Sequence, residues 1–374
     1  MDPSLGPKGT KPTWHDRGVT DQQARYDRIA EGYAEWWSPI HRPATLGLLD
    51  EIAPALDAGA TRILDIGCGT GALVAEVVAR WPSARVTGVD ISAGMLAIAA
   101  RTVDALPDGA GDRVTLVGAP ANRLPFTDGA FDVVVSAFVL QLVPSRPRAL
   151  REARRVLVPD GSLATVGWMT GGVLGADAAY DDALVAAGLE PRGDGSAGDD
   201  PATLAEAAAR LRRAGFARVR ARDGAVEHAY TPEGYLAFVC RFDDEDLFAT
   251  LDDGPRAALE ADILARLRAL PPEDLALWHP VVYATGRRSS RARGPRGAPP
   301  RGGCVGGRGP ADRPVDQPSA AASSAAGASS APSSVAATTS STRGARTRAM
   351  TSASSAWIVT PSGTTMSATV IVAS

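Results

Sequence analysis

Residues 62–72 read Arg-Ile-Leu-Asp-Ile-Gly-Cys-Gly-Thr-Gly-Ala. The apolar residues before Gly67 predict a short buried strand, and the run Ala-Leu-Val-Ala-Glu-Val-Val-Ala at 72–79 predicts a helix that begins directly after the turn. Glycines at 67, 69 and 71 permit positive φ and leave no Cβ beside a ligand. A strand, a glycine turn and a helix N-terminus together predict a site where backbone N–H groups meet a small ligand.

The glycine spacing alone fits two kinds of ligand. Gly67-x-Gly69-x-x-Ala72 satisfies the pattern of dinucleotide-binding folds. Asp65 ends the strand, and a carboxylate about 5 Å from a pyrophosphate would cost roughly 3 kcal/mol at an effective dielectric constant near 20. S-adenosylmethionine (SAM) instead carries a sulfonium and an ammonium that a carboxylate attracts. Asp65 therefore favours SAM, unless this acid only braces the turn or caps the helix.

A second acid follows where a βαβ unit would place it. Residues 85–90, Arg-Val-Thr-Gly-Val-Asp, predict the next strand, which ends on Asp90. An acid at about this interval after a glycine turn accepts hydrogen bonds from ribose hydroxyls. We expect Ile91 to lie against adenine and Ser92 to cap a helix over 93–101.

These residues resemble the class I SAM-dependent methyltransferases, particularly the small-molecule group of ubiquinone and menaquinone methyltransferases. Residues 64–71, Leu-Asp-Ile-Gly-Cys-Gly-Thr-Gly, match the first family motif, and 88–96, Gly-Val-Asp-Ile-Ser-x-x-Met-Leu, match the second. The resemblance covers residues 24–170 well and 171–288 loosely. It implies SAM as cofactor and an α/β fold with a Rossmann-like, doubly wound sheet of seven strands, six parallel and the last antiparallel. The cofactor-binding residues are then Asp65, Gly67, Cys68, Gly69, Gly71, Asp90, Ile91, Met95, Ala121, Asn122, Ala137 and Tyr26.

Other apolar runs predict the rest of this sheet. The expected strands are 113–118, 131–137, 162–169, 216–222 and 281–286, and the expected helices are 43–56, 148–156, 178–187 and 201–214.

The segment after the third strand departs from the family pattern. Relatives usually read Gly-Asp-Ala-Glu-x-Leu-Pro-Phe at the positions of residues 119–126. In this chain Pro120 stands at the position of the Asp that holds adenine. Pro120 offers neither a side-chain acceptor nor an N–H. One missing hydrogen bond is worth about 1 kcal/mol, so we expect weaker adenine recognition. Leu142 stands where relatives often carry His.

A helix from Asp21 carries aromatic residues at three- and four-residue steps, including Tyr26, Tyr33 and Trp37. This helix is expected either to pack on the body of the domain or to form a lid over the SAM and acceptor pocket. Tyr26 and Tyr33 occupy the aromatic positions of a Tyr-Asp-x-x-Ala-x-x-Tyr segment found in relatives.

A helical insertion, about residues 232–270, precedes the last strand and contains Tyr235 and Phe238. It leaves from the carboxyl edge of the sheet, so it is either an apolar cap over the acceptor or a decoration that buries its own apolar face.

The chain divides by composition. Residues 1–20 are expected to be disordered, 21–288 to form the methyltransferase domain, and 289–374 to be a disordered Arg/Gly/Pro- and then Ser/Ala-rich tail. Either the tail has no function, its arginines bind nucleic acid, or the natural reading frame ends near Arg288.

Charge and composition restrict the partners. The net charge is −3, but residues 286–374 hold 11 Arg against 2 Asp, so the acidic excess lies in the catalytic body and argues against a nucleic-acid substrate. Three cysteines and four scattered histidines predict neither a disulfide framework nor a metal site. Without a signal segment or a run of about 18 apolar residues, we expect a cytoplasmic protein with no membrane span. Oligomeric state is not indicated.

The expected reaction is SN2 transfer of a methyl group to an O, N or C atom of a small, apolar or aromatic metabolite. Much of its rate comes from positioning and desolvation, and a general base is needed only for a neutral alcohol or a carbon acid. His228 and Tyr33 are the candidates, with an ordinary surface role as the alternative for His228. A SAM-binding protein without activity and a nicotinamide-dinucleotide enzyme are the alternative functions.

Overall fold

The computed structural model describes residues 19–107, 109–192, 200–290, 355–359 and 365–369. These residues belong to one compact unit that comprises 1–290 and 351–373. The predicted N-terminal segment before residue 19 and most of the predicted tail lie outside the described residues.

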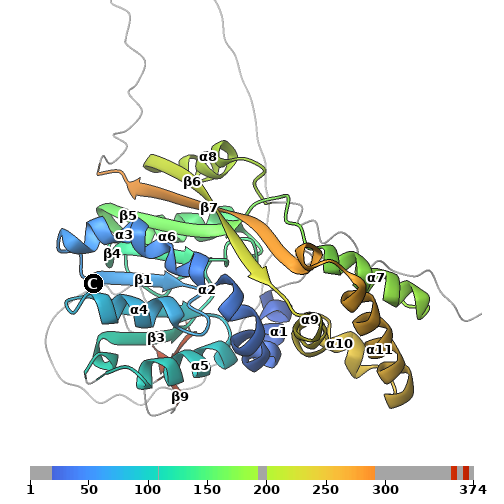
Figure 1. Cartoon of the computed structure of the whole chain (residues 1–374). Coiled ribbons are helices and arrows are strands. Elements are labelled where there is room, and N and C mark those ends of the chain that lie inside the picture. The colour runs from blue at the N-terminus through green and yellow to red at the C-terminus, as the bar shows by residue number, and fades with distance from the viewer. Residues whose placement is uncertain (1–18, 108, 193–199, 291–354, 360–364, 370–374) are drawn as a thin grey trace, which may run out of the picture. The chain divides into compact units, whose positions relative to one another are not determined.

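Within the described residues a nine-stranded sheet has the order β6-β7-β5-β4-β1-β2-β3-β8-β9 (Figure 1). The strands are β1 (Arg62–Ile66), β2 (Arg85–Asp90), β3 (Val114–Gly118), β4 (Phe131–Ala137), β5 (Leu157–Trp168), β6 (Phe216–Ala229), β7 (Ala276–Arg288), β8 (Ser355–Val359) and β9 (Thr365–Thr369). Strands β1 to β5 pair in parallel, and β7 lies antiparallel between β5 and β6, so β6 runs parallel to β5. The predicted seven-stranded doubly wound sheet is therefore confirmed, and β8 and β9 extend it beyond β3.

Helices cover both faces of this sheet. They are α1 (Val19–Gly32), η1 (Tyr33–Trp37), α2 (Ser38–Leu46), α3 (Leu48–Asp57), α4 (Ala72–Arg80), α5 (Ala93–Asp104), η2 (Gly111–Arg113), α6 (Arg146–Val156), α7 (Gly175–Ala186), α8 (Leu204–Arg213), α9 (Pro232–Phe238), η3 (Val239–Asp243), α10 (Glu245–Ala249), α11 (Asp253–Ala269) and η4 (Pro272–Leu275). Successive strand residues enter opposite cores: Ile63 packs with α3, α4 and α5, and Leu64 packs with α6 and α8. The continuous apolar runs of the sequence follow from this burial on both faces.

The helical insertion packs at the end of β6 and β7, which continue their pairing as far as Ala229 and Ala276. Helices α7, α9, α10 and α11 gather there, beside α1, and α11 contacts both α7 and α9 (Figure 1). The insertion therefore lies over the carboxyl edge of the parallel strands, next to the N-terminal helix.

The predicted helix over 43–56 is wrong in one respect, because it is divided into α2 and α3 at Gly47. The Tyr283 hydroxyl donates a hydrogen bond of 2.8 Å to the Ala44 carbonyl and fills the space beside this glycine. A Cβ at Gly47 would lie 2.4 Å from the Tyr283 oxygen. A contact from β7, more than 200 residues away, sets this boundary, so local periodicity could not predict it.

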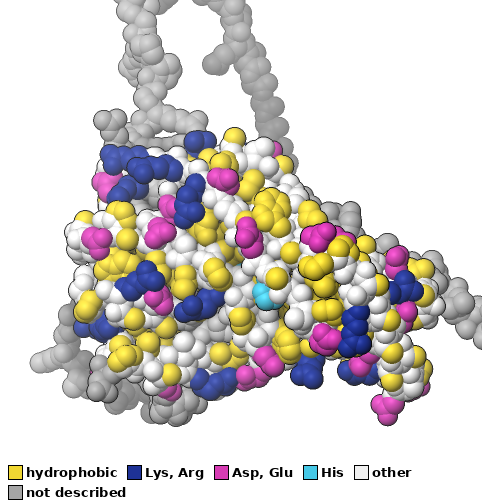
Figure 2. Space-filling model, in the orientation of Figure 1, with side chains coloured by type: hydrophobic (Ala, Val, Ile, Leu, Met, Phe, Trp, Pro, Cys, Tyr) yellow, Lys and Arg dark blue, Asp and Glu magenta, His cyan; other side chains and the backbone are white. Residues whose placement is uncertain are grey.

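The described surface mixes charges of both signs. On the face shown in Figure 2, arginines are interspersed with Asp and Glu, whereas nucleic-acid recognition uses a basic patch. None of the helices described is both long enough and apolar enough to cross a lipid bilayer.

Candidate active site

A cavity of about 380 Å³ opens at the carboxyl ends of β1, β2 and β4. Its lining joins the glycine turn, the ends of the strands, the N-terminal helices and the insertion. The lining residues are Gln22, Arg25, Tyr26, Tyr33, Trp37, Gly67, Gly69, Val89, Asp90, Ile91, Met95, Ala119, Pro120, Ala121, Asn122, Ala137, Phe138, Val139, Gln141, Leu142, Val143, Pro144, Trp168, Asp200, Phe238, Phe242, Asp243, Leu277 and His279.

The glycine turn has the geometry that the sequence predicts. Gly67, Gly69 and Gly71 have φ values of 72°, 52° and 81°, in the left-handed region that side chains rarely adopt. A Cβ at Gly67 would lie 2.1 Å from a methyl of Val139, whereas a Cβ at Gly69 would meet nothing within 4 Å. The turn therefore leaves open space beside Gly69, where a ligand fits.

Asp90 lines that space, and its carboxylate is held by the backbone. One oxygen accepts from the Gly69 N–H at 2.9 Å, and the other accepts from the Ser92 N–H at 2.9 Å. Burial raises the pKa of Asp90, and these backbone donors oppose that rise. Each carboxylate oxygen keeps a further lone pair. Asp90 therefore fits the hydroxyls of a ribose, as the nucleoside of SAM requires.

Asp65 lies beneath the turn rather than in the cavity lining. Its side chain is 2% exposed, and burial, followed by the charge of Asp90, raises its pKa to about 7. The sequence predicts the Asp65 carboxylate beside the ligand. In the structure the carboxylate that lines the cavity is that of Asp90, and Asp65 lies behind it.

Nine of the twelve predicted cofactor residues line the cavity: Tyr26, Gly67, Gly69, Asp90, Ile91, Met95, Ala121, Asn122 and Ala137. Asp65, Cys68 and Gly71 do not. Cys68 is buried against β2, where its sulfur would lie 2.9 Å from a Cβ at Gly88, and Gly71 lies against Ala99 of α5. These two residues shape the turn from behind.

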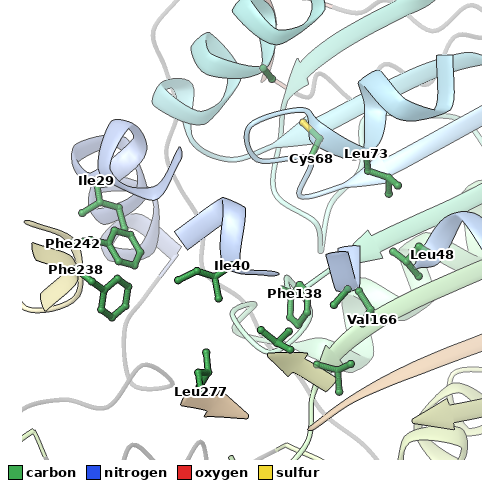
Figure 3. Close-up of a cluster of buried hydrophobic side chains, with 14 of the residues drawn as sticks. Ile29, Ile40, Leu48, Cys68, Leu73, Phe138, Val166, Phe238, Phe242 and Leu277 are labelled. Atoms are coloured by element: carbon green, nitrogen blue, oxygen red, sulfur yellow. The ribbon is translucent and has the colours of Figure 1, made fainter. Parts of the chain in front are cut away.

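Aromatic rings form the wall opposite the turn. Trp37 of η1 lies 5.6 Å from Phe238 and 6.2 Å from Phe242, between ring centroids, and Trp168 lies 4.4 Å from Phe138. Figure 3 shows Phe238 and Phe242, from the insertion, beside the helix that carries Ile29. The sequence leaves two interpretations open for both the N-terminal helix and the insertion: a cover over the pocket, or packing that plays no part in it. Both elements contribute side chains to the cavity.

Of the two residues predicted as candidates for a general base, only one lies at the cavity. Tyr33 lines the cavity, but His228 does not; its ring packs on Tyr230, at 4.4 Å between centroids. Tyr235 is fully buried and hydrogen-bonds Asp177 at 2.6 Å, so it stabilises the insertion.

Sequence reasoning missed two histidines. His279 lines the cavity, 4.6 Å from the Trp168 ring, and burial lowers its pKa. His41 lies behind Tyr33, and its Nε2 is 2.7 Å from the Tyr33 hydroxyl. A signal for His41 exists in the sequence, because residues 33, 37 and 41 follow at four-residue steps and share a helix face.

Comparison with known proteins agrees with this geometry. A family model described as a methyltransferase domain matches residues 63–161, which contain β1 to β4, the glycine turn and Asp90.

Three curated relatives are similar to this chain. The malonyl-[acyl-carrier protein] O-methyltransferase of Geobacter sulfurreducens is 39% identical over 43% of this chain and 58% of its own length. The demethylmenaquinone methyltransferase of Symbiobacterium thermophilum is 38% identical over 36% of this chain and 54% of its own length. The nocamycin O-methyltransferase of Saccharothrix syringae is 29% identical over 70% of this chain and 96% of its own length.

This chain thus spans little more than half the length of the first two relatives. The residues that the family model matches include the three left-handed glycines and Asp90 at the end of β2. Residues 63–161 thus match a methyltransferase domain, and the chain is similar to the class I SAM-dependent methyltransferases of the small-molecule type, whose cofactor is SAM.

Proposed function

We propose that this chain transfers a methyl group from SAM to an O, N or C atom of a small apolar or aromatic acceptor. The observation that carries the proposal is that a single cavity joins Gly69 and Asp90 to a wall of aromatic rings. A cofactor held at the first end would lie beside an acceptor held at the second.

The residues at one end of the cavity would bind the cofactor, and those at the other end would bind the acceptor. Asp90 would hold the ribose, and Tyr26 would cover the nucleoside from the N-terminal helix. Trp37, Trp168 and Phe238 would bury the acceptor and exclude water. When bound, SAM supplies the methyl group on its sulfonium, and the protein contributes alignment and desolvation.

The acceptor class is supported by both the cavity and the relatives. Aromatic rings contribute large apolar area to a binding site. The relatives are named as methyltransferases of demethylmenaquinone, nocamycin and malonyl-[acyl-carrier protein], so similar proteins act on different acceptors. The aromatic wall of this chain favours an apolar or aromatic molecule among them.

Calorimetry with SAM, S-adenosylhomocysteine and NAD tests the cofactor, and a methylation assay with mass detection on phenols, quinones, amines and small acids tests transfer. We expect SAM and S-adenosylhomocysteine to bind, and we expect transfer to at least one aromatic acceptor. Binding without any transfer would favour a SAM-binding protein without activity, and preferential binding of NAD would overturn the assignment.

The substitution Asp90→Asn tests the cofactor site directly. Hydrogen bonds to a charged group contribute about 1.5–3 kcal/mol, so we expect SAM affinity to fall by about 10- to 100-fold. Asp104→Asn is the matched control, because Asp104 is exposed at the last turn of α5, and it should leave affinity unchanged. Equal effects of the two substitutions would remove Asp90 from the site.

A further inference from the structure

Tyr33 and His41 form a hydrogen-bonded pair at the wall of the cavity. The Tyr33 ring lines the cavity, and its hydroxyl lies 2.7 Å from Nε2 of His41. The His41 side chain is 6% exposed, and its Nδ1 lies 3.3 Å from the Thr45 hydroxyl oxygen, one helical turn further along α2. Phe138 and Trp37 enclose the imidazole, with ring centroids 5.1 and 5.8 Å away.

The protonation of the pair follows from its burial. Burial lowers the pKa of His41 to about 4, so the imidazole is neutral near pH 7. Burial, with the charge of Asp90 and the neighbouring Tyr26, holds the pKa of Tyr33 well above 10, so its hydroxyl keeps its proton. The Tyr33 O–H therefore donates to Nε2, and the Nδ1–H donates toward Thr45. The Tyr33 oxygen keeps lone pairs that can accept a proton.

We propose that Tyr33 and His41 form a proton relay that serves a neutral hydroxyl acceptor, which makes this site an O-methylating site for phenols or enols. The inference rests on the proposed function. Tyr33 is the catalytic residue because it lines the cavity, and His41 acts through Tyr33 and is its positioning residue and proton acceptor.

The step balances in atoms and charge. A C–O bond forms between the acceptor oxygen and the methyl carbon, the C–S bond breaks, and its electron pair stays on sulfur. The hydroxyl proton passes to the Tyr33 oxygen while the Tyr33 proton passes to Nε2 of His41. One positive charge leaves sulfur and one forms on the imidazole, so the net charge of the enclosed site is unchanged. A low pKa returns the His41 proton to solvent after the product leaves.

Two acids at the cavity are engaged in ion pairs: Asp243 with Arg192, and Asp200 with Arg146, with N···O of 3.6 Å. His279 also lines the cavity, and its Nδ1 lies 3.2 Å from the Pro280 carbonyl oxygen, so its Nε2 is an acceptor when the proton is on Nδ1. His279 is therefore the competing base, and loss of the 4-cresol rate in His279→Gln but not in His41→Gln would overturn the relay. The Tyr33–His41 pair differs because one member faces the cavity and the other is a buried neutral base behind it.

The test compares two phenols of similar size in the full-length protein. At about pH 8.5, 4-nitrophenol is largely ionised and needs no base, whereas 4-cresol keeps its proton. In Tyr33→Phe and His41→Gln we expect kcat for 4-cresol to fall about a hundredfold, the typical contribution of a general base. We expect kcat for 4-nitrophenol, KM for SAM and calorimetric SAM affinity to stay within about threefold. His228→Gln, outside the cavity, is the control and should change neither phenol.

The pH dependence gives a second readout. Tyr33 faces His41, Tyr26 and Asp90, and Tyr33 is the titratable group that faces the His41 imidazole. For 4-cresol the native protein should keep a level kcat from neutral pH down to about pH 5 and lose activity as His41 becomes protonated. In Tyr33→Phe the rate should instead rise with pH as the phenol itself ionises.

A third readout does not depend on turnover. In ¹⁵N spectra of histidine-labelled protein, Tyr33→Phe should shift the Nε2 resonance of His41 and leave that of His228 unchanged.

Equal loss of kcat for both phenols, or no loss for either, overturns the relay. Transfer to amines or carbon acids but to no hydroxyl overturns the relay and leaves the proposed function intact. Absence of transfer to every acceptor overturns both.

Discussion

Asp65 and Asp90 lie on neighbouring parallel strands; Asp65 is buried, whereas Asp90 lines the cavity. Burial raises both pKa values, that of Asp65 to about 7. Residue 65 pairs with Gly88, so its carboxyl lies one strand away from Asp90 and under the same turn. The negative charge available to a cationic ligand therefore increases as pH rises through neutrality.

This linkage predicts that SAM binding releases protons. A bound cation favours ionised Asp65, so its pKa falls on binding, and affinity should rise about tenfold between about pH 6 and pH 8. Calorimetry in two buffers of different ionisation enthalpy measures the released protons. Asp65→Asn should abolish the release attributable to this residue. A release that persists unchanged in Asp65→Asn would assign the titration to another group.

In the ligand-free protein, the raised pKa of Asp65 makes the folded state less stable as pH rises. Between the unfolded value near 4 and the folded value of about 7, the native state binds more protons than the unfolded state. Asp65 therefore lowers stability progressively as pH rises from about 4 to about 7, and Asp65→Asn removes this loss. We expect Asp65→Asn to have a higher Tm than the native protein at pH 8, with a smaller difference at pH 5. Thermal unfolding at the two pH values checks the sign.

At the scale of elements, hydrogen bonds join α1 to the N-terminus of α5. One carboxylate oxygen of Asp27 accepts from the Ser92 hydroxyl at 2.7 Å and from the Gly94 N–H at 3.0 Å. A Cβ at Gly94 would lie 2.9 Å from the Asp27 carbonyl, so the two helices touch through backbone. Because Ser92 also donates its N–H to Asp90, this junction positions the ribose-binding acid and the N-terminal helix together.

We therefore expect Asp27→Ala to lower SAM affinity by about tenfold, because it removes a charged acceptor that holds α1 over the cavity. Gly94→Val should have a similar effect by separating the helices. Glu31→Ala is the matched control, since Glu31 also joins α1 to α5, through Arg101, but this ion pair is largely exposed and contributes little. Binding calorimetry and Tm separate the site effect from a folding defect. An effect of Glu31→Ala as large as that of Asp27→Ala would argue for general helix docking.

The elements that sequence predicts well are those fixed by local pattern. Residues 62–90 give β1, the glycine turn, α4 and β2 almost to the residue, because buried parallel strands are continuous apolar runs and the turn requires glycine. The junction of Asp27 with Gly94 and the break at Gly47 depend on partners distant in sequence. Local periodicity contains no information on such contacts.

At the scale of the whole molecule, the described lining of the cavity comes from one part of the chain. Every described residue that lines it lies between Gln22 and His279. The last of the seven predicted strands, β7, ends at Arg288, whose guanidinium donates to the Arg155 carbonyl at 2.8 Å and also to the Leu157 carbonyl. Beyond that point the described contribution to the sheet is β8, which pairs with three residues of β3, and β9, which pairs with β8.

A chain that ends at Ser290 should therefore keep its cofactor site. We expect its SAM affinity to equal that of the full chain within about twofold, and its Tm to fall by only a few degrees, because a few edge hydrogen bonds contribute about 1 kcal/mol each. A chain that ends at Ala284 is the control: it loses the β7 residues that pair with Ser162 and Phe216, together with the Arg288 contacts, and should unfold or aggregate. Calorimetry and thermal unfolding of the three chains measure both effects. If the chain ending at Ser290 stayed folded but bound SAM much more weakly, residues after 290 would contribute to the site from a distance. Equal binding would instead assign cofactor recognition entirely to the domain that ends with β7.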